Sequence, residues 1–466
     1  MATPDYRPEI RIPLAPPIVR QAGVAVEGSP SRLVRLRGSV FIRNVGILSA
    51  GSAVGHLFTL AAAPLLSRMY SPADFGGLGL FASFLSIISV AVALRYEVSI
   101  MSSQDEAEAA YLTFASFLFA FPISILAGGL LWLLNHFSAL GYGSLPWPAP
   151  LLMAFAMFFV GTFTSLRYWC LREGRFTQVS QGTVVQNAAR AIFQSVLGVL
   201  KLHSTGLLVG ETLGRCMGMS RMFRKAWPVL RGHFSSFRWN EFARALWRHR
   251  KFPLYSLPSS FLDALGMSLS VPLLVRLYGA SVGGYYSLVW RAVAVPSAVV
   301  TVAIADTFHS RLAACARETP AQIMGLFKRT SLALLLLGSI PTVILWFWGE
   351  PLFRFVFGAG WAVSGTIAAI VAPWYLSEFV VTPVSRVVVV LSGQEMKLIW
   401  DALSMASLIT VFFIAQWRGI GALPMIRVLT VLNTVLRMLY YLILIRIILR
   451  FKRTDAGTSQ AAACSS

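Results

Sequence analysis

Residues 110–134 read AYLTFASFLFAFPISILAGGLLWLL, an apolar stretch without a single charged side chain. An α-helix rises about 1.5 Å per residue, so this stretch would form a helix about 37 Å long. The hydrocarbon core of a bilayer is about 30 Å thick, and a helix that is apolar on all sides needs lipid or protein around it. The stretch therefore predicts a membrane-spanning helix.

Eleven other stretches of about 17 to 25 residues repeat this pattern along the chain. They cover residues 45–66, 77–94, 150–166, 179–200, 204–223, 255–275, 284–304, 329–348, 362–385, 397–416 and 420–445. The most polar are 179–200 and 204–223, whose boundaries are correspondingly the hardest to place. We predict an all-α integral membrane protein of about twelve transmembrane helices.

The overall composition supports a membrane protein. Hydrophobic residues make up 56% of the 466 residues and charged residues 13%, whereas soluble domains average about 25% charged residues. A single soluble core rarely exceeds about 250 to 300 residues. Helices in lipid can expose apolar side chains freely, so the whole chain can form one membrane body.

The formal charge of +21 comes from 40 basic and 19 acidic residues. In a soluble chain this excess would suggest a nucleic-acid partner. In a membrane protein the positive-inside rule accounts for it, because cytoplasmic loops collect Lys and Arg and contact anionic lipids. We therefore expect the lipid bilayer as a partner and no nucleic acid.

The distribution of these basic residues orients the chain. With the N-terminus inside, about 30 Lys and Arg fall on cytoplasmic segments and about five on the opposite loops, so both termini are predicted to be cytoplasmic. The predicted cytoplasmic segments are a disordered basic arm over 1–44, a basic linker over 224–253 and a tail over 449–466.

An internal repeat divides the chain into two lobes. The segment PLLSRMY at 64–70 returns as PLLVRLY at 272–278, and each copy is followed by a Gly-Gly pair, at 76–77 and at 283–284. Six predicted spans separate the copies, so the lobes, 45–223 and 254–448, have parallel topology. Binding sites in such proteins usually lie between the halves, and we expect the lobes to rock against each other about the linker.

Ionisable residues inside predicted spans mark the candidate site, because a charge at mid-bilayer costs about 2.5 to 3.5 kcal/mol. Guanidinium groups bind phosphate oxygens in a bidentate way, which favours an anionic, phosphate-bearing cargo. The cargo-binding candidates are Arg190, Arg291, Arg215 and Arg427. The candidates for coupling to an ion are Asp263, Glu211 and Glu378.

Each candidate also has a structural interpretation. Arg427 and Arg437 lie where a long side chain can reach the membrane surface, and Glu211 can pair with Arg215 at i,i+4. No acidic residue lies three or four positions from Arg190 or Arg291, so an anionic cargo would supply the missing partner. We expect these two, one from each lobe, to face a central cavity and hold the phosphates.

Glycines at every fourth position predict close helix packing. They are Gly51 and Gly55 on the first predicted span, and Gly206, Gly210, Gly214 and Gly218 on the sixth. A packing role is more common than a ligand role for such faces.

The sequence contains no pattern for chemistry on a substrate. It has no P-loop, no HExxH and no Gly-x-Ser-x-Gly motif, so neither ATP binding, metal hydrolysis nor serine hydrolysis has a candidate. The four cysteines show no CxxC spacing and are expected to be free thiols. We expect no enzyme activity, no cofactor and no bound metal.

Five segments together resemble a known family. They are SRMYSPADFG at 67–76, LRYEVSI at 94–100, FPLYSLPSSFLDALG at 252–266, LYGASVGGYYSLVWRAVAVPS at 277–297 and FGAGWAVSG at 357–365. Their order and spacing are similar to those of the oligosaccharide flippases (polysaccharide biosynthesis, Wzx-type) of the MATE-like MOP transporter superfamily, over residues 40 to 450.

The resemblance implies a twelve-helix, V-shaped transporter with a central cationic cavity that works by alternating access. Its cargo would be an undecaprenyl-diphosphate-linked oligosaccharide, moved from the cytoplasmic to the periplasmic leaflet of a bacterial inner membrane. The sugar units would serve O-antigen or exopolysaccharide synthesis. The implied protein partners are a polysaccharide polymerase and export proteins.

Three other functions are compatible with parts of the sequence. A cation-coupled multidrug exporter of the same superfamily would usually have an acidic residue in its first helix, and the predicted spans 45–66 and 77–94 contain none. A membrane-embedded polysaccharide polymerase or ligase would need a long outer loop with basic residues. A scaffold of an export complex would not need charges inside its spans.

Overall fold

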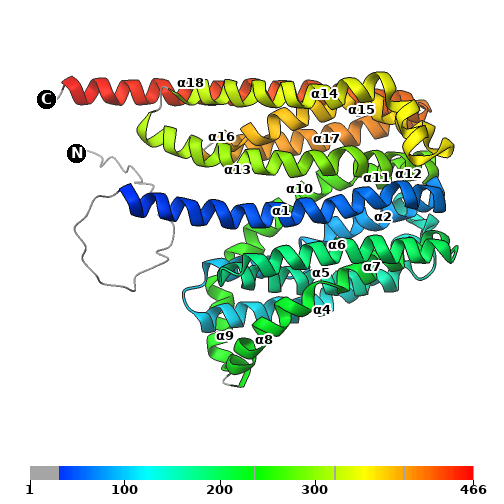
Figure 1. The fold of residues 1–466 in the computed structure, drawn as a ribbon, viewed down its shortest axis with the longest axis horizontal. Coiled ribbons are helices and arrows are strands. Elements are labelled where there is room, and N and C mark those ends of the chain that lie inside the picture. Colours follow the sequence, from blue (N-terminus) through cyan, green and yellow to red (C-terminus); the bar gives the residue numbers. More distant parts are fainter. Residues whose placement is uncertain (1–30, 236, 320–321, 392–393, 465–466) are drawn as a thin grey trace, which may run out of the picture.

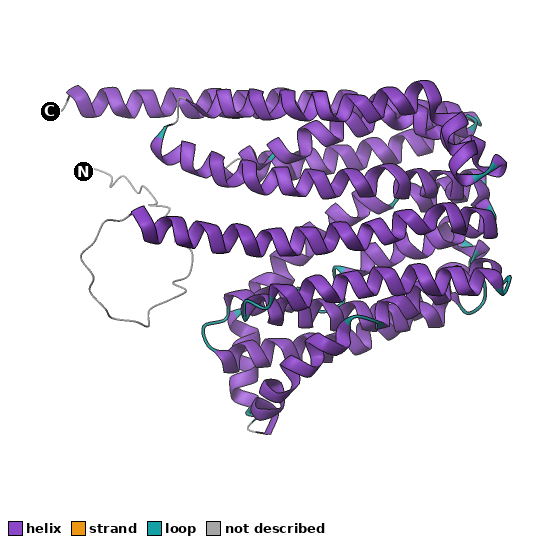
Figure 2. Cartoon of the chain, in the orientation of Figure 1, coloured by secondary structure: helices purple, strands orange, loops and turns teal. Residues whose placement is uncertain are grey.

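The computed structural model describes residues 31–235, 237–319, 322–391 and 394–464. Within these ranges every regular element is helical and there is no strand (Figure 2), which confirms the predicted all-α class. Residues 1–30 of the predicted arm lie outside the described ranges, whereas residues 31–44 continue the first helix instead of forming part of a disordered arm. Leu and Arg favour a helix there, and no proline interrupts the chain between Pro30 and Pro64.

The first half of the chain forms one group of helices, which we call the first lobe (Figure 1). It contains α1 (Ser31–Met69), α2 (Pro72–Ser89), α3 (Tyr96–Ser99), η1 (Ile100–Ser102), α4 (Glu106–His136), η2 (Ala139–Ser144), α5 (Ala149–Arg172), α6 (Phe176–Val199) and α7 (His203–Cys216). Two amphipathic helices follow, α8 (Met219–Ser235) and α9 (Trp239–Arg248).

The second half forms the second lobe, which begins with a π-helical turn. It contains η3 (Phe252–Ser256), α10 (Leu257–Ser268), α11 (Ser270–Tyr278), α12 (Ala280–Val289), η4 (Trp290–Ala294), α13 (Val295–Glu318), α14 (Ile323–Phe357), η6 (Ala359–Trp361), α15 (Ala362–Val384), α16 (Arg386–Val390), α17 (Gln394–Arg418) and α18 (Ala422–Cys464). α1 begins and α18 ends at the same end of the molecule (Figure 1). We call this the terminal end and the opposite one the far end.

Every predicted span overlaps one or more helices in the described residues. Eight helices are long and apolar enough to cross a membrane, or nine with the pair Phe252–Ser268 and Ser270–Tyr278, which is bent by 41°. The other three predicted spans correspond to the polar α6, to α7 and to the run from α12 through η4 to α13. α7 is shorter than predicted and ends at Cys216, because Gly218 follows with a left-handed φ of +81°.

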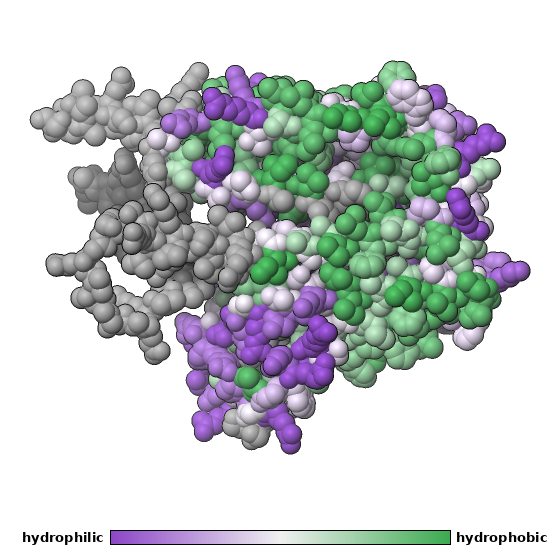
Figure 3. Space-filling view, in the orientation of Figure 1, coloured by the Kyte–Doolittle hydropathy of each residue, from purple (hydrophilic) through white to green (hydrophobic). Residues whose placement is uncertain are grey.

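The outer surface has the polarity expected of a protein in lipid. Only 17% of the apolar window in Gly46–Met69 and in Ile323–Phe357 is buried within the protein. In Figure 3, hydrophobic side chains predominate over the coloured surface away from α8 and α9, and hydrophilic ones gather over α8 and α9. Apolar surface on this scale is stable only against lipid or another protein.

The two copies of the sequence repeat meet at the far end. They end α1 and α11, and the Gly-Gly pairs begin the next helices, α2 and α12, which pack along each other. A Cβ atom added to Gly76 would lie 2.0 Å from the carbonyl oxygen of Ala280, and one added to Gly284 would lie 1.7 Å from that of Pro72. Only glycine permits this approach, so the Gly-Gly pairs that follow the two copies of the repeat allow α2 and α12 to pack backbone against backbone.

A second contact at the far end joins α1 to the segment after α14. Ser67 Oγ donates to the carbonyl oxygen of Phe357 at 2.9 Å, and Trp361 Nε1 donates to that of Ser67 at 2.7 Å. The Trp361 ring also packs edge-on against Phe75, with 4.9 Å between centroids. These buried contacts hold the two lobes together at the far end.

α8 and α9 are attached to the first lobe. Arg248 Nη1 lies 2.9 Å from Glu108 Oε1 on α4, and His249 Nε2 lies 3.4 Å from the same oxygen. The Tyr111 hydroxyl donates to Glu241 Oε2 at 3.2 Å. The basic segment between the lobes therefore packs with α4, and the chain crosses to the second lobe only after residue 249.

Candidate functional site

The strongest candidate site is a buried ion cluster between α6 and α7. Glu211 on α7 is 1% exposed, and its Oε1 atom lies 3.1 Å from Arg190 Nη1 and 2.7 Å from Arg215 Nη2. The two arginine side chains keep 18% and 22% of their surface exposed. One carboxylate thus orients two guanidinium groups that still reach accessible space.

Amide side chains surround this ion cluster. Arg190 Nη2 donates to Asn187 Oδ1, and Gln194 Nε2 donates to Glu211 Oε2 at 3.4 Å. Gln186 Nε2 donates to the carbonyl oxygen of Arg215 at 3.1 Å. Arg190 Nε is buried and has no hydrogen-bond partner among the described residues, so the ring of partners around this guanidinium is incomplete.

The glycine faces place these side chains. A Cβ atom added to Gly214 would lie 2.6 Å from Cα of Arg190, and one added to Gly55 would lie 2.7 Å from Nδ2 of Asn187. α6 can therefore lie close to α7 on one side and to α1 on the other. This confirms the packing predicted from the four-residue spacing, and it brings Arg190 within reach of Glu211.

The second lobe adds a third arginine. Arg291 lies in the π-helical turn η4, where an extra residue per turn re-aims the side chains. Its charge interacts with those of Glu211, Arg190 and Arg215. In the described part of the chain Arg291 makes no hydrogen bond or ion pair. Counted together with Arg190, Arg215 and Glu211, with whose charges its own charge interacts, it brings the total to three guanidinium groups and one carboxylate, a net charge of +2.

The other predicted site residues lie elsewhere. Arg427 is exposed on α18, one to two turns from its start, and Asp263 is exposed on α10. Glu378 Oε2 pairs with Arg437 Nη2 at 2.5 Å, within the second lobe. Of the seven candidates, the structure brings together Arg190, Arg291, Arg215 and Glu211.

Two sequence expectations can be compared with these contacts. The i,i+4 pair of Glu211 with Arg215 is present as predicted. The expectation that Arg190 has no acidic partner is wrong, because Glu211 approaches it from the next helix. Arg190 and Glu211 are 21 residues apart on different helices, so the i,i+3 and i,i+4 spacings of a single helix do not predict this pair.

Sequence reasoning also missed aromatic residues beside Arg291. The Trp290 and Tyr375 rings lie 6.1 Å apart, and Trp374 stacks on Tyr375 at 5.6 Å. The Tyr375 hydroxyl and Trp374 Nε1 are buried without a partner in the described residues. The signal available in the sequence was the Trp-Arg and Trp-Tyr dipeptides inside apolar stretches.

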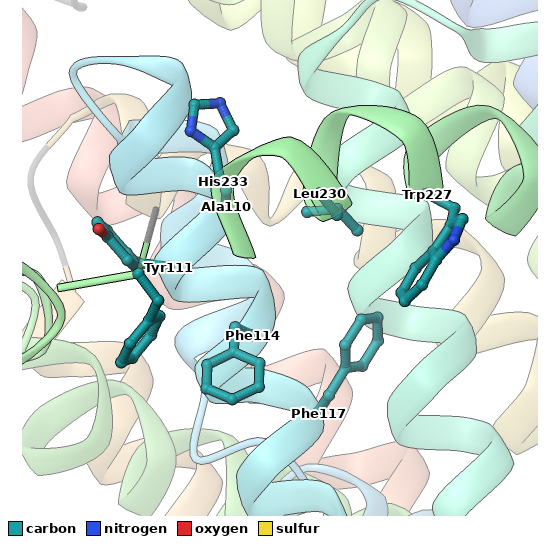
Figure 4. Close-up of a pocket in the computed structure, with 8 residues that line it drawn as sticks. Ala110, Tyr111, Phe114, Phe117, Trp227, Leu230 and His233 are labelled. Carbon is teal, nitrogen blue, oxygen red and sulfur yellow. The ribbon is translucent and has the colours of Figure 1, made fainter. Parts of the chain in front are cut away.

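A separate pocket lies between α4 and α8 (Figure 4). It has a volume of about 40 Å³ and is lined by aromatic and aliphatic side chains that include Tyr111, Phe114 and Trp227. Ligand pockets usually measure about 300 to 1,000 Å³, so this one is a packing gap. Across the described residues no group of three or more His, Cys, Asp or Glu side chains could hold a metal ion.

Comparison with known proteins gives the family. The model of the polysaccharide biosynthesis protein family matches residues 65–365. No curated protein matches the sequence.

Solved structures share the fold at low sequence identity. An inward-facing multidrug resistance MATE family transporter of the MOP superfamily is 13% identical, with a TM-score of 0.65 over 86% of this chain and 96% of its own. The lipid II flippase MurJ in an inward closed conformation is 14% identical, with a TM-score of 0.65 over 90% and 92%. A MOP superfamily transporter from Pyrococcus furiosus is 14% identical, with a TM-score of 0.57 over 88% and 96%.

These identities show a common fold and nothing finer. The family match covers more than half of the chain. It includes all of the repeat except Pro64, and it includes Arg190, Glu211, Arg215 and Arg291. The chain is an all-α, multi-pass membrane protein with the fold of the MOP superfamily, and it belongs to the polysaccharide biosynthesis protein family.

Proposed function

We propose that this protein is a flippase that moves undecaprenyl-diphosphate-linked oligosaccharide from the cytoplasmic to the periplasmic leaflet of a bacterial inner membrane. The family match and the fold shared with a lipid II flippase support transport of a lipid-linked saccharide precursor. The observation that carries the proposal is the arginine cluster, which has a net charge of +2 and draws side chains from both lobes.

The chemistry of a diphosphate suits this cluster. Its oxygens can accept paired hydrogen bonds from planar guanidinium groups, and its negative charge balances the excess of arginine over glutamate. Arg291 has no partner among the described residues, and Arg190 Nε is also unpartnered. We propose that the phosphates bind between these two arginines while Glu211 keeps Arg190 and Arg215 oriented.

Alternating access would follow from the two lobes. In the predicted topology the terminal end is cytoplasmic, so the contacts of Gly76, Gly284 and Ser67 lie on the periplasmic side. Separating them would expose the arginine cluster to the other leaflet. We propose that the lobes rock in this way and that transport involves no chemical step. A polymerase and export proteins would then use the translocated oligosaccharide for O-antigen or exopolysaccharide synthesis.

Multidrug export, the main alternative, fits the charges less well. α2 begins earlier than predicted and so includes Asp74, yet this carboxylate caps the helix: it accepts hydrogen bonds from the Ser71 backbone and from Ser204. The cluster reached by both lobes is cationic, which repels a cationic drug. A proton- or sodium-coupled exporter would instead need a free carboxylate there.

Purified protein in liposomes with labelled lipid-linked oligosaccharide tests the proposal, scored as accessibility of the label on each leaflet. We expect Arg190→Ala and Arg291→Ala to lose transport, Lys to retain part of it because it keeps the charge without the bidentate fork, and Glu to abolish it. Arg427→Ala is the matched control, since Arg427 is exposed and outside the cluster. Wild-type rates for both cluster variants, at wild-type abundance, would refute the proposed site.

A further inference from the structure

A second buried charge lies outside the arginine cluster, in the turn between α2 and α4 at the terminal end. Leu94 and Arg95 both adopt left-handed backbone conformations, with φ of 51° and 65°. Residues other than glycine rarely do so, and two in succession persist only where the surrounding structure holds them. The strained pair begins the helical turn α3, which carries Glu97.

Glu97 is a buried carboxyl group with incomplete pairing. Its side chain is 4% exposed, Oε1 lies 3.9 Å from Arg95 Nη1, and Oε2 has no hydrogen-bond partner among the described residues. An ionised carboxylate in this setting is costly, because one oxygen has lost water and gained no donor. Burial raises the pKa of Glu97 to about 7, although its own backbone N–H and Arg95 act in the opposite direction.

The other charged groups near this turn are engaged elsewhere or exposed. α3 packs against α4, α5 and η3. On α4, Glu108 pairs with Arg248 and His249. On α5, Arg172 donates hydrogen bonds to the Ser103 hydroxyl and to the Asp105 carbonyl oxygen. Arg167 on α5 and Tyr255 on η3 are exposed. Arg95 is thus the charged group that acts on Glu97.

Arg95 also contacts the other lobe. Its Nε atom donates to Ser256 Oγ at 3.4 Å, and Ser256 ends the π-helical turn η3 with which the second lobe begins. Because α9 is attached to α4 up to His249, this turn is the first part of the chain that can move with the second lobe. The Arg95 guanidinium is therefore shared between Glu97 in its own lobe and Ser256 across the junction.

We propose that Glu97 is a proton-binding site whose occupancy sets the strength of the Arg95–Ser256 contact between the lobes. When the carboxylate takes up a proton from water at the terminal end, it no longer attracts the guanidinium, and Arg95 can bind Ser256 fully. When the proton leaves, the carboxylate draws Arg95 back and the junction loosens. The effect on transport rests on the proposed flippase function, whereas proton binding itself does not.

The sign of the pH effect follows from the direction of the shift. In the arrangement seen here Glu97 is buried and its pKa is raised to about 7, whereas a solvated glutamate has a pKa of about 4.3. The buried arrangement therefore binds the proton more tightly than an arrangement in which water reaches Glu97. Relative to that arrangement it gains population as the pH falls from about 7 toward about 4.3, by up to about tenfold per pH unit. Above about pH 7 the population should change no further.

Spin labels at two exposed positions on either side of the junction can report this equilibrium. Met101 and Leu254 are suitable, in a background without the four native cysteines. We expect the wild-type distance distribution in liposomes to change between about pH 8 and about pH 5. Glu97→Gln, which mimics the protonated form, should show the low-pH distribution at both values. Glu106→Gln is the matched control, because Glu106 is exposed nearby on α4, and should keep the wild-type response.

Infrared titration of the carboxyl band gives a readout that is independent of transport. We expect a protonated carboxyl near neutral pH that Glu97→Gln removes and Ser256→Ala keeps, while Ser256→Ala loses the pH response of the spin labels. A wild-type pH response in Glu97→Gln, or no carboxyl band assignable to Glu97, would overturn the proposal. If both responses appear but no lipid-linked oligosaccharide is moved, the proton site stands and the proposed cargo is wrong.

Discussion

Replacing Gly284 with alanine should open the far end of the molecule. The new methyl carbon would lie 1.7 Å from the Pro72 carbonyl oxygen and 2.9 Å from the Gly76 nitrogen. Ordinary contact begins at 3.4 Å, so α2 and α12 would have to separate by about 1.7 Å, and backbone atoms cannot rotate away as a side chain can.

The size of the effect can be bounded. Overpacking of this kind costs about 1 to 3 kcal/mol, and the cost falls only on the arrangement in which the two helices touch. The closed far end should therefore lose about five- to 150-fold in population relative to an arrangement with the far end open. Gly76→Ala should act in the same direction, because its methyl carbon would lie 2.0 Å from the Ala280 carbonyl oxygen.

Distances between spin labels at Ala73 and Ser281 provide the assay, since both residues are exposed at the starts of α2 and α12. Gly284→Ala should shift the distribution to longer distances. Gly129→Ala is the matched control: this glycine lies inside α4 with nothing within 4 Å of an added Cβ atom, so alanine should leave the distances unchanged. An unchanged distribution in a well-folded Gly284→Ala protein would refute the idea that this glycine contact keeps the far end closed.

Two other outcomes follow, one from the structure and one from the sequence. Glu211→Ala removes the carboxylate shared by Arg190 and Arg215, whose side chains are only 18% and 22% exposed. We expect a loss of stability that approaches the about 3 to 5 kcal/mol of a broken buried pair, measured as a lower midpoint of thermal unfolding in detergent; a midpoint equal to that of Arg427→Ala would contradict it. Reporter fusions after residue 240 and at the C-terminus should both give cytoplasmic signals, from the predicted bias of about 30 to about five basic residues, and a periplasmic signal from either would reverse the topology.

Most of the fold could be predicted from the sequence, because a helix that spans a bilayer must be long and apolar. Length and apolarity placed a helix in each of the twelve predicted spans. The repeated PLLSRMY and PLLVRLY segments predicted two parallel lobes, but the close contact between α2 and α12 at the Gly-Gly pairs is seen only in the structure. The end of α7 was missed by several residues. Its apolar pattern continues through Met217 and Met219, and only the left-handed Gly218 stops the helix.

Only part of the candidate site could be predicted, because the sequence does not show which residues of different helices contact each other. Arg190 and Arg291 were identified by the cost of placing a charge in a span. The carboxylate between Arg190 and Arg215 depends on the register of α6 against α7, which Gly210 and Gly214 set through close backbone contact. Arg95 and Glu97 were noted only as part of the family-like segment LRYEVSI, because nothing in that segment predicts the left-handed turn at Leu94 and Arg95 that precedes the buried Glu97.

In the proposed function the protein must release its anionic cargo, and the carboxylate inside the arginine cluster suits that requirement. Three unpaired arginines would repel one another in the empty state and would hold a diphosphate too tightly to let it leave. Glu211 neutralises one of the three charges and orients Arg190 and Arg215 in advance, so less ordering is needed when the anion arrives. Arg291 comes from the other lobe. Rocking would change its distance from the other two and weaken the site during the motion that delivers the cargo.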